Sequence, residues 1–223
     1  MTRIVEDSWR KDPRAGVLVI VFGVAIVSFV LLVVAAMLFP SFAALDETAS
    51  SAFASIDSDF LDSASRAFTR LGDIEIMMLL TALASVALWY TGRRPESILL
   101  AATVALGTGL GSLFKDIFER ARPDFEYVRI PIPDTYSFPS GHALASFLLF
   151  STIAFIVVLE AERFATRVWV TTALLTLGVF VGLSRVYLGV HYFGDVIASW
   201  MLGSAWMTVT VASYFWLTRQ QAE

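Results

Sequence analysis

Six apolar runs, each close to the length of a membrane span, constrain this chain more than any other feature. A helix needs about 20 mostly apolar residues to cross the hydrocarbon core of a bilayer. Short polar connections separate the runs, and no repeat or low-complexity tract interrupts them. We therefore expect an all-α fold, a bundle of six transmembrane helices that forms a single domain over residues 1–223. The runs cover residues 15–39, 74–90, 97–114, 143–159, 168–183 and 196–217.

The composition excludes several classes of protein. Only 16% of the residues are charged, against about 25% in a typical soluble domain, so a water-soluble globule is excluded. The net charge of −4 provides no electrostatic basis for binding nucleic acid. The sequence contains no cysteine, which excludes a disulfide framework, a thiolate metal site and a cysteine nucleophile. Any imidazole chemistry must use His142 or His191, because these are the only two histidines.

The longest connection, residues 40–73, joins the first two runs. Apolar residues are interspersed with acids there, so we expect a short amphipathic segment at the membrane surface between the first and second spans. The first run is far longer than the core of about 7 to 15 residues found in a signal peptide. We therefore expect it to remain in the protein as a span.

The distribution of Lys and Arg indicates the orientation, because positive residues accumulate on the cytoplasmic side of a membrane. With the N-terminus inside, nine of them fall on inner segments and seven on outer segments. If Lys115, Arg122 and Arg185 are set aside as functional, the ratio becomes nine to four. We expect a multi-pass protein of the cell membrane with both termini in the cytoplasm.

Three polar clusters interrupt the apolar pattern near the ends of the runs. They cover residues 115–123 after the third run, 139–142 before the fourth, and 184–195 between the fifth and the sixth. Two runs separate the second cluster from the third, and an even number of crossings returns the chain to the same face of the membrane. All three clusters are therefore predicted to lie at one aqueous boundary, which this orientation makes the extracytoplasmic one.

The spacing within the clusters favours a shared site. Lys115 and Arg122 are seven residues apart, so a continuing helix would present both cations on one face. His191 and Asp195 are four apart, which places the carboxylate where it can hold one ring nitrogen and leave the other free to attack.

A helix N-terminus adds free backbone N–H groups to this inventory. Ser140 and Gly141 stand just ahead of the fourth run, where such groups suit an anion. Cations and amides can neutralise the oxygens of a phosphoryl group, while His191 attacks phosphorus and His142 protonates the departing oxygen. Each residue alone also has an ordinary interpretation, as an interfacial histidine or a snorkelling cation. Their joint placement favours a site for phosphoryl transfer.

The pattern Lys-x6-Arg-Pro, Pro-Ser-Gly-His and Ser-Arg-x5-His-x3-Asp resembles the three-part signature of the type-2 phosphatidic acid phosphatase superfamily, and all eleven fixed positions match in order. The resemblance implies a six-helix membrane core and a lipid phosphatase that needs no metal or other cofactor. It further implies His191 as the nucleophile, oriented by Asp195, and His142 as the acid. The residues that would bind phosphate are Lys115, Arg122, Ser140, Gly141 and Arg185.

The expected function is removal of phosphate from a lipid phosphate or diphosphate in the outer leaflet, with membrane lipids as its surroundings. By the resemblance, the candidate substrates are undecaprenyl diphosphate, phosphatidylglycerophosphate, phosphatidic acid and diacylglycerol pyrophosphate. Two alternatives stay open: a lipid phosphotransferase of the same superfamily, and a membrane protein that binds lipid phosphates without catalysis. Arg120 and Arg129 are further cations near the site that would either meet a lipid headgroup or face water.

Overall fold

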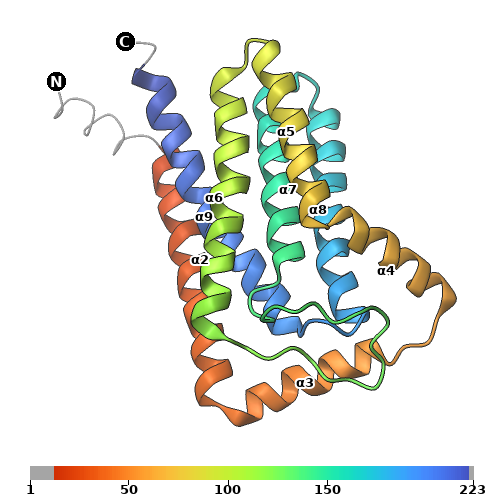
Figure 1. Cartoon of the computed structure of the whole chain (residues 1–223). Coiled ribbons are helices and arrows are strands. Elements are labelled where there is room, and N and C mark those ends of the chain that lie inside the picture. The colour runs from red at the N-terminus through yellow and green to blue at the C-terminus, as the bar shows by residue number, and fades with distance from the viewer. Residues whose placement is uncertain (1–12, 221–223) are drawn as a thin grey trace.

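The computed structural model describes residues 13–220, which form eight helices and no strand within that range. In Figure 1 the helices stand roughly side by side, with α2 and α9 together on one flank and α3 across one end. The all-helical class expected from the sequence is confirmed for the described residues. The helices are α2 (Pro13–Leu38), α3 (Pro40–Ala54), α4 (Asp59–Leu71), α5 (Ile74–Tyr90), α6 (Arg94–Phe118), α7 (Gly141–Glu160), α8 (Phe164–Tyr187) and α9 (Phe193–Gln220).

Five of the described helices, α2 and α6 to α9, are long and apolar enough to cross a membrane. The sixth expected span, α5, has 17 residues and meets this test only together with α4, from which it is bent by 53°. The described part of the chain therefore contains five candidate spans, or six if the bent pair counts as one. Several helices also extend beyond the apolar runs, because backbone hydrogen bonds continue where the side chains become polar; α6, for example, begins at Arg94 and ends at Phe118.

The connection between α2 and α5 forms two helices. Pro40 occupies the first turn of α3, where its missing N–H has no helical partner to lose. The hydroxyl of Ser58 caps α4 by accepting a hydrogen bond from the N–H of Leu61 at 3.4 Å. On α3, Asp46 and Ser50 are buried, so this connection contributes polar groups to the protein interior.

Helix α7 lies at the centre of the bundle and contacts α5, α6, α8 and α9. Its side chains Leu144 and Leu148 are almost completely buried. Gly107 and Gly111 of α6 allow this packing, because a Cβ atom at either position would lie within 2.5 Å of one of those leucine side chains. The outer surface of the bundle is also apolar. On α2, many large aliphatic side chains are exposed, as expected for a helix that faces lipid.

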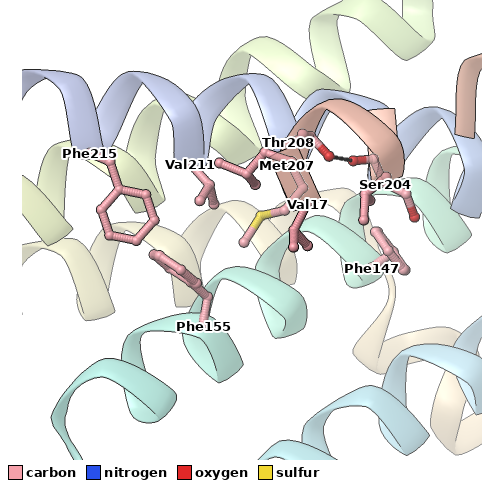
Figure 2. A pocket seen from close by; sticks show the side chains of 10 residues that line it. Val17, Phe147, Phe155, Ser204, Met207, Thr208, Val211 and Phe215 are labelled. Atoms are coloured by element: carbon pink, nitrogen blue, oxygen red, sulfur yellow. Dashed lines mark hydrogen bonds between the residues drawn. The ribbon is translucent and has the colours of Figure 1, made fainter. Parts of the chain in front are cut away.

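An apolar cavity of about 510 Å³ lies between α2, α7 and α9 (Figure 2). Two hydroxyls in its wall, those of Ser204 and Thr208, donate to backbone carbonyls of α9 at 2.7 and 2.8 Å. The other lining side chains are apolar, among them Val17, Phe147 and Phe155. This cavity suits hydrocarbon and not a charged headgroup, so the phosphate chemistry must be sought elsewhere.

Candidate active site

The three polar clusters meet at one end of the bundle. Helix α7 leaves this end at Gly141 and α8 returns to it at Tyr187, as the even number of crossings requires. The connection between α6 and α7, residues 119–140, crosses the same end beside α3 (Figure 1). The start of α7 is joined directly to the start of α9, because the N–H of Ser140 donates to the carbonyl of Asp195 at 3.3 Å.

Lys115 and Arg122 do not lie on one continuous helix, so that part of the sequence interpretation is wrong. Glu119 adopts a left-handed backbone conformation (φ 46°), which ends α6 and turns the chain before Arg122. The two cations still converge, because both donate to the carbonyl of Tyr136. The distances are 2.5 Å from Lys115 Nζ and 3.4 Å from Arg122 Nη2.

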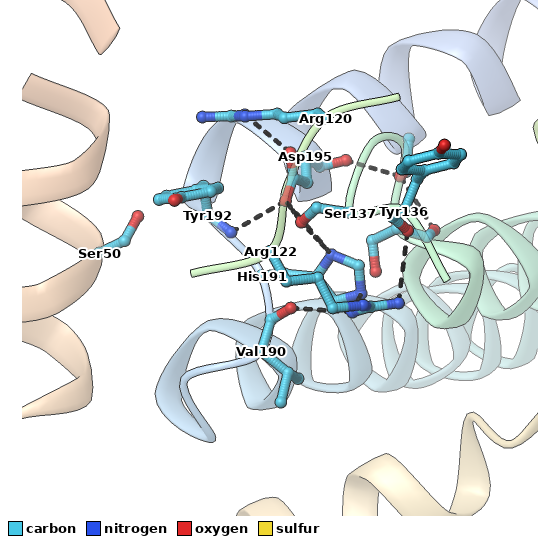
Figure 3. Close-up of polar contacts among 12 residues, drawn as sticks. Ser50, Arg120, Arg122, Tyr136, Ser137, Val190, His191, Tyr192 and Asp195 are labelled. Carbon is cyan, nitrogen blue, oxygen red and sulfur yellow. Dashed lines mark hydrogen bonds and ion pairs between the residues drawn. The ribbon is translucent and has the colours of Figure 1, made fainter. Parts of the chain in front are cut away.

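The contacts of the His191 ring determine its tautomer (Figure 3). Nη1 of Arg122 lies 3.0 Å from Nε2 of His191. A guanidinium can only donate hydrogen bonds, so Nε2 must accept and therefore carries the lone pair. The proton then belongs on Nδ1, which lies 3.2 Å from Oδ2 of Asp195. The ring thus presents an unprotonated nitrogen to a cation and a protonated one to a carboxylate.

The surroundings of His191 also keep the ring neutral. The side chain is almost completely buried, between the ends of α8 and α9. Burial lowers the pKa of His191 from 6.5 to about 3, although the hydrogen bond and charge of Asp195 act in the opposite direction. The positive charges of Arg185 and Arg122 lower the pKa further. His191 is therefore a neutral base at neutral pH.

Asp195 is held by several donors at the start of α9. Its Oδ2 accepts a hydrogen bond from the N–H of Tyr192 at 3.0 Å. An acidic side chain in the first turn of a helix commonly makes this contact with the residue that precedes the helix. Ser137 donates to the same oxygen and lies 3.3 Å from Nδ1 of His191. The sequence interpretation missed Ser137. Its position two residues before the Pro139 motif is the signal that could have identified it.

The second histidine has its own carboxylate. Nε2 of His142 lies 3.0 Å from Oδ1 of Asp73, the residue before the first turn of α5. Gly72 makes this approach possible, because a Cβ atom there would lie 3.3 Å from the His142 ring and 2.4 Å from Val181. Asp73 was missed in the sequence, where it appeared only as the end of a polar connection. A Gly-Asp pair at the start of a span is the signal that could have drawn attention to it.

Two buried polar groups in the clusters have no hydrogen-bond partner among the described residues: Nε of Arg185 and Oγ of Ser140. Arg185 lies within α8, and its Nη1 donates a hydrogen bond to the hydroxyl of Thr69. Buried donors need a hydrogen-bond partner, so both groups are able to donate to an oxygen of a bound phosphate. Fewer backbone N–H groups are free at the start of α7 than predicted, because the N–H of Ser140 already donates to the backbone carbonyl of Asp195.

A polar cavity of about 680 Å³ adjoins this cluster at the end of α6. Lys115 and Arg122 line it, so a phosphate group in this cavity would meet both cations. Asp116 and Asp134 also line the cavity, which gives its wall both signs of charge.

Arg120 and Arg129 are both engaged by protein groups. Arg129 pairs with Asp62 of α4 at 2.8 Å and lies over the ring of Tyr187, with Cζ 4.5 Å from the ring centre. Arg120 pairs with Asp46 and with Asp195 at 3.0 and 2.7 Å. Neither arginine lines the polar cavity that holds Lys115 and Arg122.

The chain is similar to several characterised proteins. It is 27% identical over 183 residues to phosphatidylglycerophosphatase B of Bacillus subtilis (strain 168), a match that covers 81% of this chain and 88% of that protein. It is 36% identical over 115 residues to an undecaprenyl-diphosphatase of Sulfolobus acidocaldarius, but this match covers only 50% of this chain and 52% of that protein.

Solved structures show the same fold. The crystal structure of the PAP2 type phosphatidylglycerolphosphate phosphatase from Bacillus subtilis superimposes with a TM-score of 0.78 and 25% identity, over 86% of this chain and 94% of that one. Aquifex aeolicus LpxE superimposes with a TM-score of 0.58 and 20% identity, over 74% and 93% of the two chains. The model of the PAP2 superfamily matches residues 96–219, a range that contains all three polar clusters. This chain therefore belongs to the PAP2 superfamily.

Proposed function

We propose that this protein is an integral membrane lipid phosphatase that transfers the phosphoryl group of a lipid phosphate or diphosphate to His191 and then to water. The observation that carries the proposal is the state of the His191 ring. Its Nε2 lies 3.0 Å from Nη1 of Arg122, a group that can only donate, while Nδ1 faces Oδ2 of Asp195 at 3.2 Å. A binding protein would need the cations but would have no use for an imidazole oriented in this way.

The first step of the proposed reaction forms a covalent phosphohistidine. The lone pair of His191 Nε2 attacks phosphorus, and the bond from phosphorus to the lipid oxygen breaks. His142 gives a proton to that oxygen, while Asp73 orients the His142 ring and stabilises the charge of its protonated form. Arg185 and Ser140 have unpaired groups that can donate to the phosphoryl oxygens, and Arg122 adds its positive charge beside Nε2 of His191.

The second step restores the enzyme. Water attacks the phosphohistidine, His142 accepts a proton from it, and the bond from nitrogen to phosphorus breaks to release inorganic phosphate. Asp195 balances the charge on the phosphorylated ring throughout. Two steps divide a barrier that is among the highest known, since hydrolysis of a phosphate monoester can require about 10²¹-fold acceleration.

The position of the site supports a lipid substrate. The chemistry lies at one end of a bundle whose sides are apolar, so the headgroup can enter the polar cavity while the tails remain in the bilayer. The names of the relatives support phosphatidylglycerophosphate and undecaprenyl diphosphate as the first substrates to test. The Lys and Arg distribution supports a site on the extracytoplasmic face, with both termini in the cytoplasm.

A phosphate-release panel tests this function. The purified protein in detergent micelles is offered undecaprenyl diphosphate, phosphatidylglycerophosphate, phosphatidic acid and diacylglycerol pyrophosphate, with the His191→Ala variant as the control. Release of phosphate from at least one lipid by the native protein alone is the expected result. Appearance of the phosphoryl group on an added acceptor lipid, with no inorganic phosphate released, would instead identify a phosphotransferase, and no transfer from any of the four would contradict the proposal.

We expect turnover to be independent of metal ions. Among residues 13–220 no group of three or more His, Cys, Asp or Glu side chains is placed to hold a metal ion, and the orphaned donors near the histidines are cationic or neutral. Excess EDTA should leave the rate unchanged, whereas vanadate should inhibit because it resembles the trigonal transition state. A metal-dependent phosphatase assayed in the same buffer is the control. Loss of turnover in EDTA that a divalent ion restores would contradict this expectation.

A further inference from the structure

The carboxylate of Asp195 has a second side that the proposed reaction does not use. Oδ2 faces His191, whereas Oδ1 accepts a hydrogen bond from Nη1 of Arg120 at 2.7 Å. Figure 3 shows Arg120 on the side of Asp195 opposite to the His191 ring. Arg120 therefore contacts Asp195 on the side away from His191, the proposed nucleophile.

Arg120 is itself held in place from three directions. Its Nη2 donates to Oδ2 of Asp46 at 3.0 Å, and its Cζ lies 4.1 Å from the centre of the Tyr192 ring. Its backbone carbonyl accepts the N–H of Ser137 at 2.8 Å, and Ser137 also binds Asp195. These contacts leave the guanidinium in one orientation.

Asp46 belongs to α3, the helix that lies across one end of the bundle, and joins that helix to the first turn of α9. Its Oδ1 accepts the N–H of Gly194 at 2.9 Å, and Ser50, one turn later on α3, accepts the N–H of Phe193 at 2.9 Å. The contact requires glycine at position 194, because a Cβ atom there would lie 2.6 Å from Oδ2 of Asp46. A series of polar contacts through Asp46, Arg120 and Asp195 therefore connects α3 with His191.

We propose that Arg120, held by Asp46, is a positioning residue that fixes Asp195 and offsets its negative charge, so that the His191 ring stays both oriented and neutral. The proposal rests on the function proposed above only where the readout is turnover. Arg129 provides a matched comparison, since it is also an arginine paired with a carboxylate and placed over a tyrosine ring, but it does not touch Asp195.

The sign of the charge effect follows from the groups around His191. Asp195 of α9 favours the protonated ring, while Arg122 of the α6–α7 connection and Arg185 of α8 oppose it. Behind Asp195, Arg120 is opposed in turn by Asp46 of α3. Removing the charge of Arg120 leaves Asp195 less neutralised, so the protonated ring is stabilised and the pKa of His191 rises.

The test compares Arg120→Gln and Arg120→Lys with Arg129→Gln in the full chain in detergent micelles. The chain has only two histidines, so NMR of the labelled imidazoles reports His191 once the His142 signal is assigned with a His142→Ala sample. We expect Arg120→Gln to raise the pKa of His191 by roughly one unit or more, as loss of a neighbouring charge does. Arg129→Gln should lower the melting temperature without moving that pKa, and Arg120→Lys should restore part of the native value.

Turnover provides the second readout. In Arg120→Gln we expect kcat to fall by about 10- to 100-fold, the range seen when a metal-bound histidine loses its outer partner. KM should be nearly unchanged, and the acid limb of the pH profile should move to higher pH. Equal titration of His191 in Arg120→Gln and the native protein would overturn the proposal. A shift in the titration of a protein that hydrolyses no lipid would refute the proposed function and leave the positioning role intact.

Discussion

Replacing His191 with alanine should abolish phosphate release from every lipid substrate, with a loss in kcat of about 10⁴-fold or more. His191 supplies the atom that forms the bond to phosphorus, and cations alone cannot replace it. The loss should be complete at every pH between 5 and 8, because the native ring is neutral throughout that range, as its pKa of about 3 requires. Phosphate release at saturating lipid measures the effect directly.

A control must separate lost chemistry from lost packing, since His191 is buried. Val190→Ala removes buried side-chain atoms from the adjacent position and keeps the backbone carbonyl, which accepts a hydrogen bond from Arg122 at 2.9 Å. We expect Val190→Ala to retain most of the native turnover. Substantial turnover in a folded His191→Ala protein would contradict the role of nucleophile.

The covalent intermediate gives the same prediction a second readout. A brief reaction of the native protein with lipid labelled in the phosphate, followed by denaturation at alkaline pH, should leave label on the protein. The label should be lost in acid, because the bond from phosphorus to an imidazole nitrogen is acid-labile. The His191→Ala protein should carry none.

Replacing His142 with alanine should reduce turnover to a degree that depends on the leaving group. On a lipid phosphate the departing alkoxide needs a proton, and loss of a general acid costs about 10²- to 10⁴-fold. On an aryl phosphate with an acidic phenol the leaving group needs little protonation, so the loss should be much smaller. Measuring kcat/KM of the variant on both substrates checks this, and equal losses would contradict the acid role.

The carboxylate behind His142 makes the second prediction sharper. Asp73→Asn should reproduce the leaving-group dependence of His142→Ala in weaker form, because the amide still meets the ring at 3.0 Å but carries no charge. Asp62→Asn is the matched control, since Asp62 is also a carboxylate on this side of the bundle but pairs with Arg129. Asp62→Asn should affect both substrates alike.

Much of the fold could be predicted from the sequence because the bilayer imposes a length on each span. The apolar runs predicted the helical class, and run 74–90 coincides with α5. The count of six spans was less secure, because α5 is short and reaches span length only with the bent α4. The even number of crossings also placed His142 and His191 at one end, since topology depends on the number of spans and not on their exact bounds.

The pairing of His191 with Asp195 could be predicted from their spacing, but the more distant partners of the site residues could not. Asp73 and His142 are 69 residues apart, Asp46 and Arg120 are 74 apart, and Arg120 and Asp195 are 75 apart. No periodicity connects such positions, and a lone carboxylate in a polar connection resembles any solvated one. The turn at Glu119 was equally hidden, because a left-handed residue that is not glycine depends on the surrounding packing.

The sequence by itself determined the membrane class, the superfamily resemblance and the end of the bundle at which the chemistry would lie, because span length and motif spacing are local properties. Only the tertiary structure decided which nitrogen of His191 faces Arg122, which carboxylate accompanies His142 and how α3 contacts Asp195 through Arg120. These features depend on hydrogen bonds between groups far apart in the chain, and such contacts exist only once the helices have packed.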